Sequence, residues 1–134
     1  MKQLFKINNY TPGIAWFFVV LILICLPGRD IPKVSELEFI HFDKIVHISI
    51  FGLLTLLMMM PTVNSSISKK SKLLNMLLIL IVVSTWGLTT EFIQKYLIPG
   101  RSFDLLDWAA DSFGAFIAFI ICRKKIAINF KKFI

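Results

Sequence analysis

Hydrophobic residues in this chain gather in four runs, separated by short polar segments. The runs predict helices at about residues 12–27, 44–61, 73–94 and 104–122. The third run is about long enough to cross the ~30 Å of a hydrocarbon core at ~1.5 Å per helical residue. The pattern therefore predicts an all-α protein, an integral membrane bundle of four transmembrane helices that forms one domain over residues 1–134.

Composition supports a membrane protein over a water-soluble one. Of the 134 residues, 57% are hydrophobic and 13 are Phe, which is too apolar for a soluble domain of this size. Cys25 and Cys122 lie inside apolar runs without metal-ligand spacing, so we interpret them as small buried hydrophobic residues.

The segments between the runs carry the usual signals of helix ends. A basic start before a short apolar run also describes a signal peptide, but no small-x-small cleavage site follows, so we expect an uncleaved first helix. We expect residues 28–43 to form a surface loop with a short amphipathic piece at the membrane interface (Val34, Leu37, Phe39 and Phe42). Pro61 is expected to end the second helix, Pro99 and Gly100 to break the third, and the residues after Cys122 to form a basic interfacial tail.

Charge is distributed unequally between the two sides of this topology. The amino terminus, the 62–72 segment and the tail hold ten Lys and Arg residues, whereas the opposite side holds five of these and all eight acidic residues. The positive-inside rule therefore predicts that both termini are cytoplasmic. Attraction to anionic inner-leaflet lipid accounts for the net charge of +7, so no nucleic-acid partner is expected.

Ionisable residues gather at the non-cytoplasmic ends of the predicted helices. Such groups are costly within a membrane and indicate a functional site. The candidate ligand-binding residues are Asp43, Lys44, His47, Glu91, Gln94, Arg101, Asp104, Asp107 and Asp111. Because neighbouring antiparallel spans pair, we expect one polar cluster in which the acids pair with Lys44 and Arg101, or Asp111 retains a proton.

The order and spacing of these residues resemble a known family. Asp43-Lys44-x-x-His47, Glu91-x-x-Gln94 and Pro99-x-Arg101-x-x-Asp104-x-x-Asp107-x-x-x-Asp111-x-x-Gly114 look like the VanZ-like family of small bacterial membrane proteins. The resemblance covers about residues 40–120 and implies a multi-pass protein of the bacterial inner (cytoplasmic) membrane. The family's name-giving member is associated with lowered susceptibility to teicoplanin, which implies antibiotic resistance as an outcome. One departure is Asp111, which stands where family members often have Asn.

Three hypotheses about function remain open. In the first, Lys44 and Arg101 bind an anionic lipid headgroup, a lipid-linked envelope precursor or a glycopeptide-type ligand in an extracytoplasmic polar pocket. In the second, the protein is an enzyme acting on a lipid-linked phosphate, with His47 and Asp107 as catalytic acid and base. In the third it is a scaffold subunit of an envelope complex, with a membrane-protein partner.

A metal site and a serine nucleophile both lack a supporting sequence motif. His47, Glu91, Asp107 and Asp111 have the donor types of a Zn²⁺ or Mn²⁺ site, but no H-E-x-x-H pattern accompanies them, so neither a metal nor another cofactor is expected. Ser102 lacks a nucleophile signature. A purely structural network, with Asp104 capping the fourth helix, is the alternative to any ligand site.

Overall fold

The computed structural model describes residues 7–27 and 36–131, which form helices and no strand. The elements are η1 (Ile7–Tyr10), α1 (Thr11–Ile24), α2 (Glu36–Asn64), α3 (Lys69–Leu97) and α4 (Leu105–Lys131). This confirms the expected all-α fold. Residues 28–35, the first half of the expected 28–43 loop, lie outside the described ranges.

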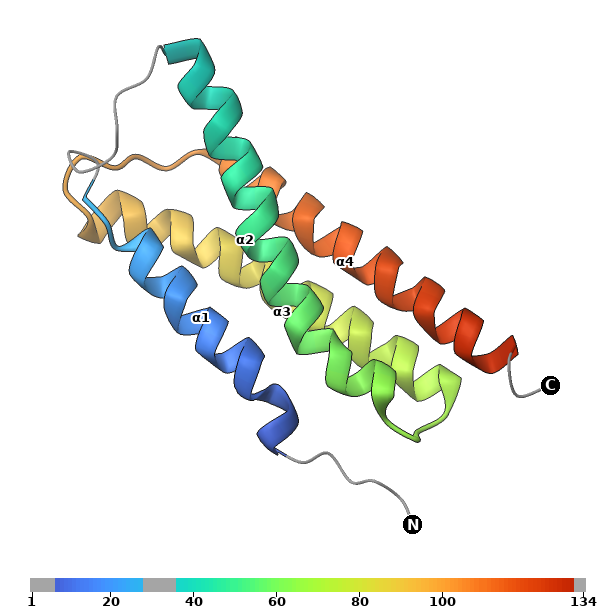
Figure 1. Ribbon diagram of the computed structural model, residues 1–134. Coiled ribbons are helices and arrows are strands. Elements are labelled where there is room, and N and C mark those ends of the chain that lie inside the picture. The colour runs from blue at the N-terminus through green and yellow to red at the C-terminus, as the bar shows by residue number, and fades with distance from the viewer. Residues whose placement is uncertain (1–6, 28–35, 132–134) are drawn as a thin grey trace.

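Successive helices run up and down in the bundle, so that their connections alternate between its two ends (Figure 1). The start of α1, the α2–α3 turn and the end of α4 lie at one end. Residues 98–104, which join α3 to α4, lie at the other, which we call the Arg101 end. Each helix therefore contributes its Arg101-end residues to a common level.

Glycine at the α2–α4 contact lets these two helices approach closely. A Cβ atom at Gly114 would lie 2.9 Å from the Ile48 carbonyl carbon, and one at Gly52 would lie 3.2 Å from the Gly114 oxygen. Small residues allow such close packing between membrane helices, where no hydrophobic force draws helices together. The contact holds the amino-terminal part of α4 against α2, and this is what positions the polar site.

Apolar clusters fill the interior away from the Arg101 end. One joins α1, α2, α3 and α4 through Val20, Ile24, Phe51, Leu54, Val83 and Ala115, and a second joins α2, α3 and α4 through Met59, Val63, Met76, Phe119, Cys122 and Ile126. Many large apolar side chains on the outer faces remain exposed. Apolar surface of this extent fits a lipid environment.

Three of the described helices are long and apolar enough to cross a membrane: Phe42–Asn64, Lys69–Leu97 and Leu105–Ile128. The first apolar helix, α1, has 14 residues and is shorter than a span of this kind. The chain is therefore a helical membrane protein. Its first helix differs from the other three in length.

Helix ends differ from expectation at several places. The expected loop at residues 28–43 is wrong for its second half, because α2 begins at Glu36, beyond Pro32 in a stretch that contains neither Gly nor Pro. Pro61 lies inside α2, which ends at Asn64. The loss of one backbone hydrogen bond is tolerated this close to a helix end. The basic residues that follow Cys122 continue α4 as far as Lys131.

Candidate functional site

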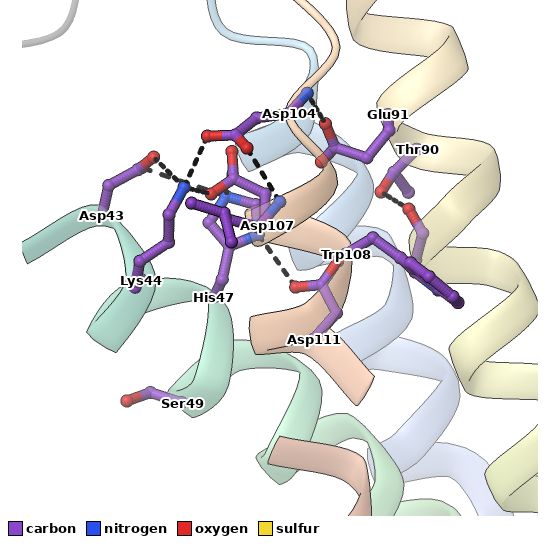
Figure 2. A network of polar contacts seen from close by, with 12 residues as sticks. Asp43, Lys44, His47, Ser49, Thr90, Glu91, Asp104, Asp107, Trp108 and Asp111 are labelled. Atoms are coloured by element: carbon purple, nitrogen blue, oxygen red, sulfur yellow. Dashed lines mark hydrogen bonds and ion pairs between the residues drawn. The ribbon is translucent and has the colours of Figure 1, made fainter. Parts of the chain in front are cut away.

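The Arg101 end of the bundle carries a network of polar side chains from α2, α3 and α4 (Figure 2). On α2, Asp43 and His47 are one turn apart and share a face. On α4, Asp107 and Asp111 are likewise one turn apart and face α2. Glu91 projects toward this network from α3, so the structure brings three of the predicted groups of residues together.

Lys44 pairs with carboxylates on both α2 and α4. Its Nζ donates to Asp104 Oδ2 at 2.7 Å and also donates to Asp107 Oδ1. Asp43 Oδ2 lies 4.0 Å from the same nitrogen. Ion pairs with several carboxylates therefore neutralise Lys44, and its side chain cross-links two helices.

Asp104 joins the 98–104 connection to both neighbouring helices. Its backbone N–H donates to Glu91 Oε2 on α3, and its own Oδ1 accepts from the Leu106 N–H, each at 2.8 Å. The second bond is that of an N-cap at the start of α4. Burial raises the pKa of the Asp104 carboxyl, but the hydrogen bonds from Lys44 and Leu106 outweigh this effect and hold the pKa below its ordinary value.

His47 is the buried centre of the network, with 5% of its surface exposed. Its Nδ1 lies 2.8 Å from Asp111 Oδ1, within hydrogen-bond distance. Its Nε2 lies 3.9 Å from Asp43 Oδ1 and 3.8 Å from Asp107 Oδ2. The imidazole is thus oriented by one carboxylate on one side and faces two more on the other.

Two sets of side chains have ligand atoms close enough to hold a metal ion. Asp43, His47 and Asp107 form one set, and His47, Glu91 and Asp111 form the other. In each set the ligand atoms all lie within 4.8 Å of one another. His47 belongs to both sets. A single ion would therefore bind one ring nitrogen of His47 and the two carboxylates of one set, not the whole cluster.

Beside this network is a pocket of about 180 Å³ with one polar side. Asp43, His47, Gln94 and Arg101 supply the polar groups. The rest of the lining is apolar and comes from α1 with the residues that follow it and from α2: Leu23, Ile24, Leu26, Phe42, Val46 and Ile50. Arg101 Nε is buried and has no hydrogen-bond partner among the described residues.

Gly87, Ser84 and Ser112 were not among the residues that the sequence indicated for the site, whereas Trp108, beside Asp107, was expected to touch the cluster. Gly87 leaves room for Asp111, since a Cβ atom there would lie 2.9 Å from Asp111 Oδ2. Trp108 Nε1 donates to the Ser84 carbonyl oxygen at 3.0 Å, and the Ser84 and Ser112 hydroxyls lie 2.7 Å apart. Gly87 stands four residues before Glu91, and this helical spacing is the one clue that it shares the face of the site.

Comparison with known proteins identifies the family of this chain. A family model described as VanZ/LLP1 matches residues 3–128, which is nearly the whole chain and includes all nine candidate residues. No curated protein and no solved structure matched. The match extends well beyond the segment whose motifs suggested the resemblance, and the chain belongs to the VanZ/LLP1 family.

Proposed function

We propose that this protein is a multi-pass envelope protein of the bacterial cytoplasmic membrane that binds the anionic headgroup of an amphiphile at Arg101. The amphiphile is a membrane lipid, a lipid-linked envelope precursor or a lipoglycopeptide. Binding takes place on the non-cytoplasmic side. Lowered susceptibility to glycopeptides such as teicoplanin follows as an outcome for the cell.

The proposal includes four transmembrane helices. The 14 residues of α1 span about 21 Å at ~1.5 Å per residue. The preceding η1 adds four residues at ~2.0 Å each, or about 8 Å. Together they approach the ~30 Å of a hydrocarbon core, which supports a first span built from both elements.

Charge supports an orientation with both termini in the cytoplasm. In the predicted topology, ten of the 15 Lys and Arg residues belong to the amino terminus, the 62–72 segment and the tail, whereas the eight acidic residues belong to the segments on the other side. Basic residues near helix ends are retained on the cytoplasmic side. The pocket beside Arg101 would then open toward the outer leaflet.

The observation that supports this proposal is the position of Arg101. Its Nε donor is unpartnered among the described residues, and it lines a pocket with one polar and one apolar side. Ion pairs with nearby carboxylates neutralise Lys44, whereas Arg101 Nε is buried and has no hydrogen-bond partner in the described part of the chain. A guanidinium binds phosphate and carboxylate groups through a planar pair of donors. The apolar wall from α1 and α2 suits the hydrocarbon part of the same ligand.

A thermal-shift experiment tests this proposal. Protein purified in a neutral detergent is mixed with phosphatidylglycerol, undecaprenyl phosphate or teicoplanin, and its melting temperature is measured. We expect at least one ligand to raise the melting temperature of the native protein and to leave Arg101→Ala unchanged. An equal rise in Lys95→Ala, whose exposed cation lies at the same end, is the matched control. The proposal fails if none of the three ligands shifts the native protein.

The hydrogen bond between His47 and Asp111 favours a second candidate, an enzyme acting on a lipid-linked phosphate. A carboxylate on Nδ1 orients an imidazole for proton transfer through Nε2. His47 also lines the pocket in which Arg101 would hold the phosphate. Turnover of undecaprenyl diphosphate that stops in His47→Gln would support this candidate, and an absence of turnover in the native protein would exclude it for that substrate.

A further inference from the structure

Two fully buried carboxylates in the site each have an oxygen atom without a hydrogen-bond partner. Glu91 and Asp111 are both 0% exposed. Among the residues that the structure describes, Glu91 Oε1 and Asp111 Oδ2 have no hydrogen-bond partner, although the other oxygen of each side chain is hydrogen-bonded. Leaving such atoms unpaired in a low-dielectric interior is costly, so a positive group bound between them would stabilise this part of the site.

The cations of the cluster do not reach this pair. Lys44 contacts Asp43, Asp104 and Asp107. Among the described residues, the imidazole of His47 is the basic group within ion-pair distance of Asp111, and no basic side chain makes an ion pair with Glu91. The part of the network formed by His47, Glu91 and Asp111, which we call the deeper set, therefore contains more carboxylate groups than cations.

The deeper atoms converge from the three longest helices. His47 comes from α2, Glu91 from α3 and Asp111 from α4, and their ligand atoms lie within 4.8 Å of one another. Bonds of about 2.0–2.2 Å keep any two ligand atoms of one ion within about 4.4 Å of each other, so small side-chain rotations would close the set around one ion. Imidazole with two carboxylates suits Zn²⁺ or Mn²⁺ better than Ca²⁺ or Mg²⁺.

We propose that His47, Glu91 and Asp111 bind one divalent transition-metal ion, Zn²⁺ or Mn²⁺, which ties α2, α3 and α4 together beneath the pocket. Nδ1 of His47 is the ligand nitrogen, because it is the one beside Asp111. Nε2 then directs its proton toward Asp43 and Asp107, as ligand histidines commonly do toward an outer carboxylate. The pocket that His47 lines gives the ion a path of entry.

The other set of possible ligands fits a metal ion less well. Asp43, His47 and Asp107 also converge, but Lys44 already pairs with Asp107 and lies near Asp43. A cation there would compete with an ammonium group that is already in place. The unpartnered oxygens of Glu91 and Asp111 belong to the deeper set, and for this reason we assign the metal ion to that set.

Metal binding is measured on the full-length protein in detergent, treated with a chelator, dialysed and then titrated with ZnCl₂ or MnCl₂. We expect one equivalent of one of these metals by elemental analysis and a higher melting temperature. Glu91→Gln and Asp111→Asn should each weaken binding about 100-fold or more, since even outer-shell partners of a metal are worth about 10–100-fold in affinity. Lys95→Gln removes an exposed charge at the same end of the bundle, outside the network, and should bind one equivalent.

A measurement on the native protein keeps the proposal testable if a variant fails to fold. X-ray absorption of the zinc or manganese complex should show one imidazole among nitrogen and oxygen ligands. Binding of less than 0.1 equivalent of both metals, or a spectrum without imidazole, would overturn the proposal. So would equal affinity in the native protein and a folded Asp111→Asn variant. None of these results depends on whether Arg101 binds a ligand.

Discussion

At the scale of single residues, Lys44 is the cation that balances the negative charge of the carboxylates at the α2–α4 contact. It faces Asp104 and Asp107 with only 20% of its side chain exposed. Removing one partner of such a group leaves uncompensated charge, which costs more than the pair contributes. The stability of the site therefore depends on charge balance rather than on the number of ion pairs.

Lys44→Met should accordingly destabilise the protein, whereas Lys44→Met combined with Asp107→Asn should recover part of the loss. We expect the single variant to lose less than the about 3–5 kcal/mol typical of fully buried pairs, because Lys44 is partly exposed. Thermal unfolding in detergent measures both. A double variant that is less stable than the single one would contradict this account.

Asp104 gives the site a dependence on pH. Its pKa in the folded protein is held below the ordinary value of 3.8, so its contribution to stability is present above that value and is lost as pH falls through the folded-state pKa. The native protein should therefore lose its advantage over Asp104→Asn as pH falls from 6 to about 3. Asn is also a good N-cap, so the variant isolates the charge. Melting temperatures of the two proteins at each pH test this, and a constant difference would contradict it.

The spacing of residues predicted which side chains share a helix face but not how each one is partnered. Asp107 and Asp111 follow from a helical period, and the structure places both on the inner face of α4. The same pattern suggested Lys44 and Arg101 as a pair of anion ligands. In the structure Lys44 is ion-paired, whereas Arg101 Nε has no hydrogen-bond partner among the described residues. This difference depends on how far each side chain reaches in the folded bundle, which sequence spacing does not encode.

At the scale of helices, glycine sets how closely α2 and α4 pack. Gly114→Val would drive a side chain into the carbonyl group of Ile48. We expect a loss of at least about 1–3 kcal/mol, the usual cost of overpacking. Ala127→Val, at an exposed position on the same helix, is the matched control and should unfold near the native temperature. Similar melting temperatures for the two variants would show that the contact is loose.

Helix existence was predictable here, whereas several helix boundaries were not. The apolar runs located four helices because burial in lipid needs long continuous stretches. Glu36 begins α2 earlier than expected and α3 begins at Lys69, ahead of the apolar run, with Ser68 as its N-cap. Polar helical turns extend these helices beyond the apolar run, and hydropathy does not reveal such turns.

At the scale of the whole molecule, the proposed orientation predicts which connections a reagent can reach. Ser66 lies in the α2–α3 turn and Ser102 in the α3–α4 connection, and both are exposed. In a background with Cys25→Ser and Cys122→Ser, a membrane-impermeant maleimide should label Ser102→Cys in intact protoplasts. Ser66→Cys should react only after permeabilisation. The reverse pattern would place the Arg101 end in the cytoplasm.

A polar pocket was expected from the sequence, but its apolar wall lay beyond what the sequence could indicate. Its apolar wall includes Leu23, Ile24 and Leu26, which come from α1 and the residues just after it and have no motif to distinguish them from residues that face lipid. Only the packing of α1 beside α2 places them opposite Arg101. The sequence indicated the charged half of the site, and the fold supplied the other.

The most direct test of the central claim is native mass spectrometry of the protein extracted from bacterial membranes. The native protein and Lys95→Gln should each carry one co-purifying anionic amphiphile, and Arg101→Gln should have lost it. Arg101 is a cation whose buried Nε donor lacks a hydrogen-bond partner among the described residues, so its loss should remove the ligand without unfolding the bundle. Equal occupancy in a folded Arg101→Gln variant, or a native protein that carries no anionic amphiphile, would contradict the proposed function.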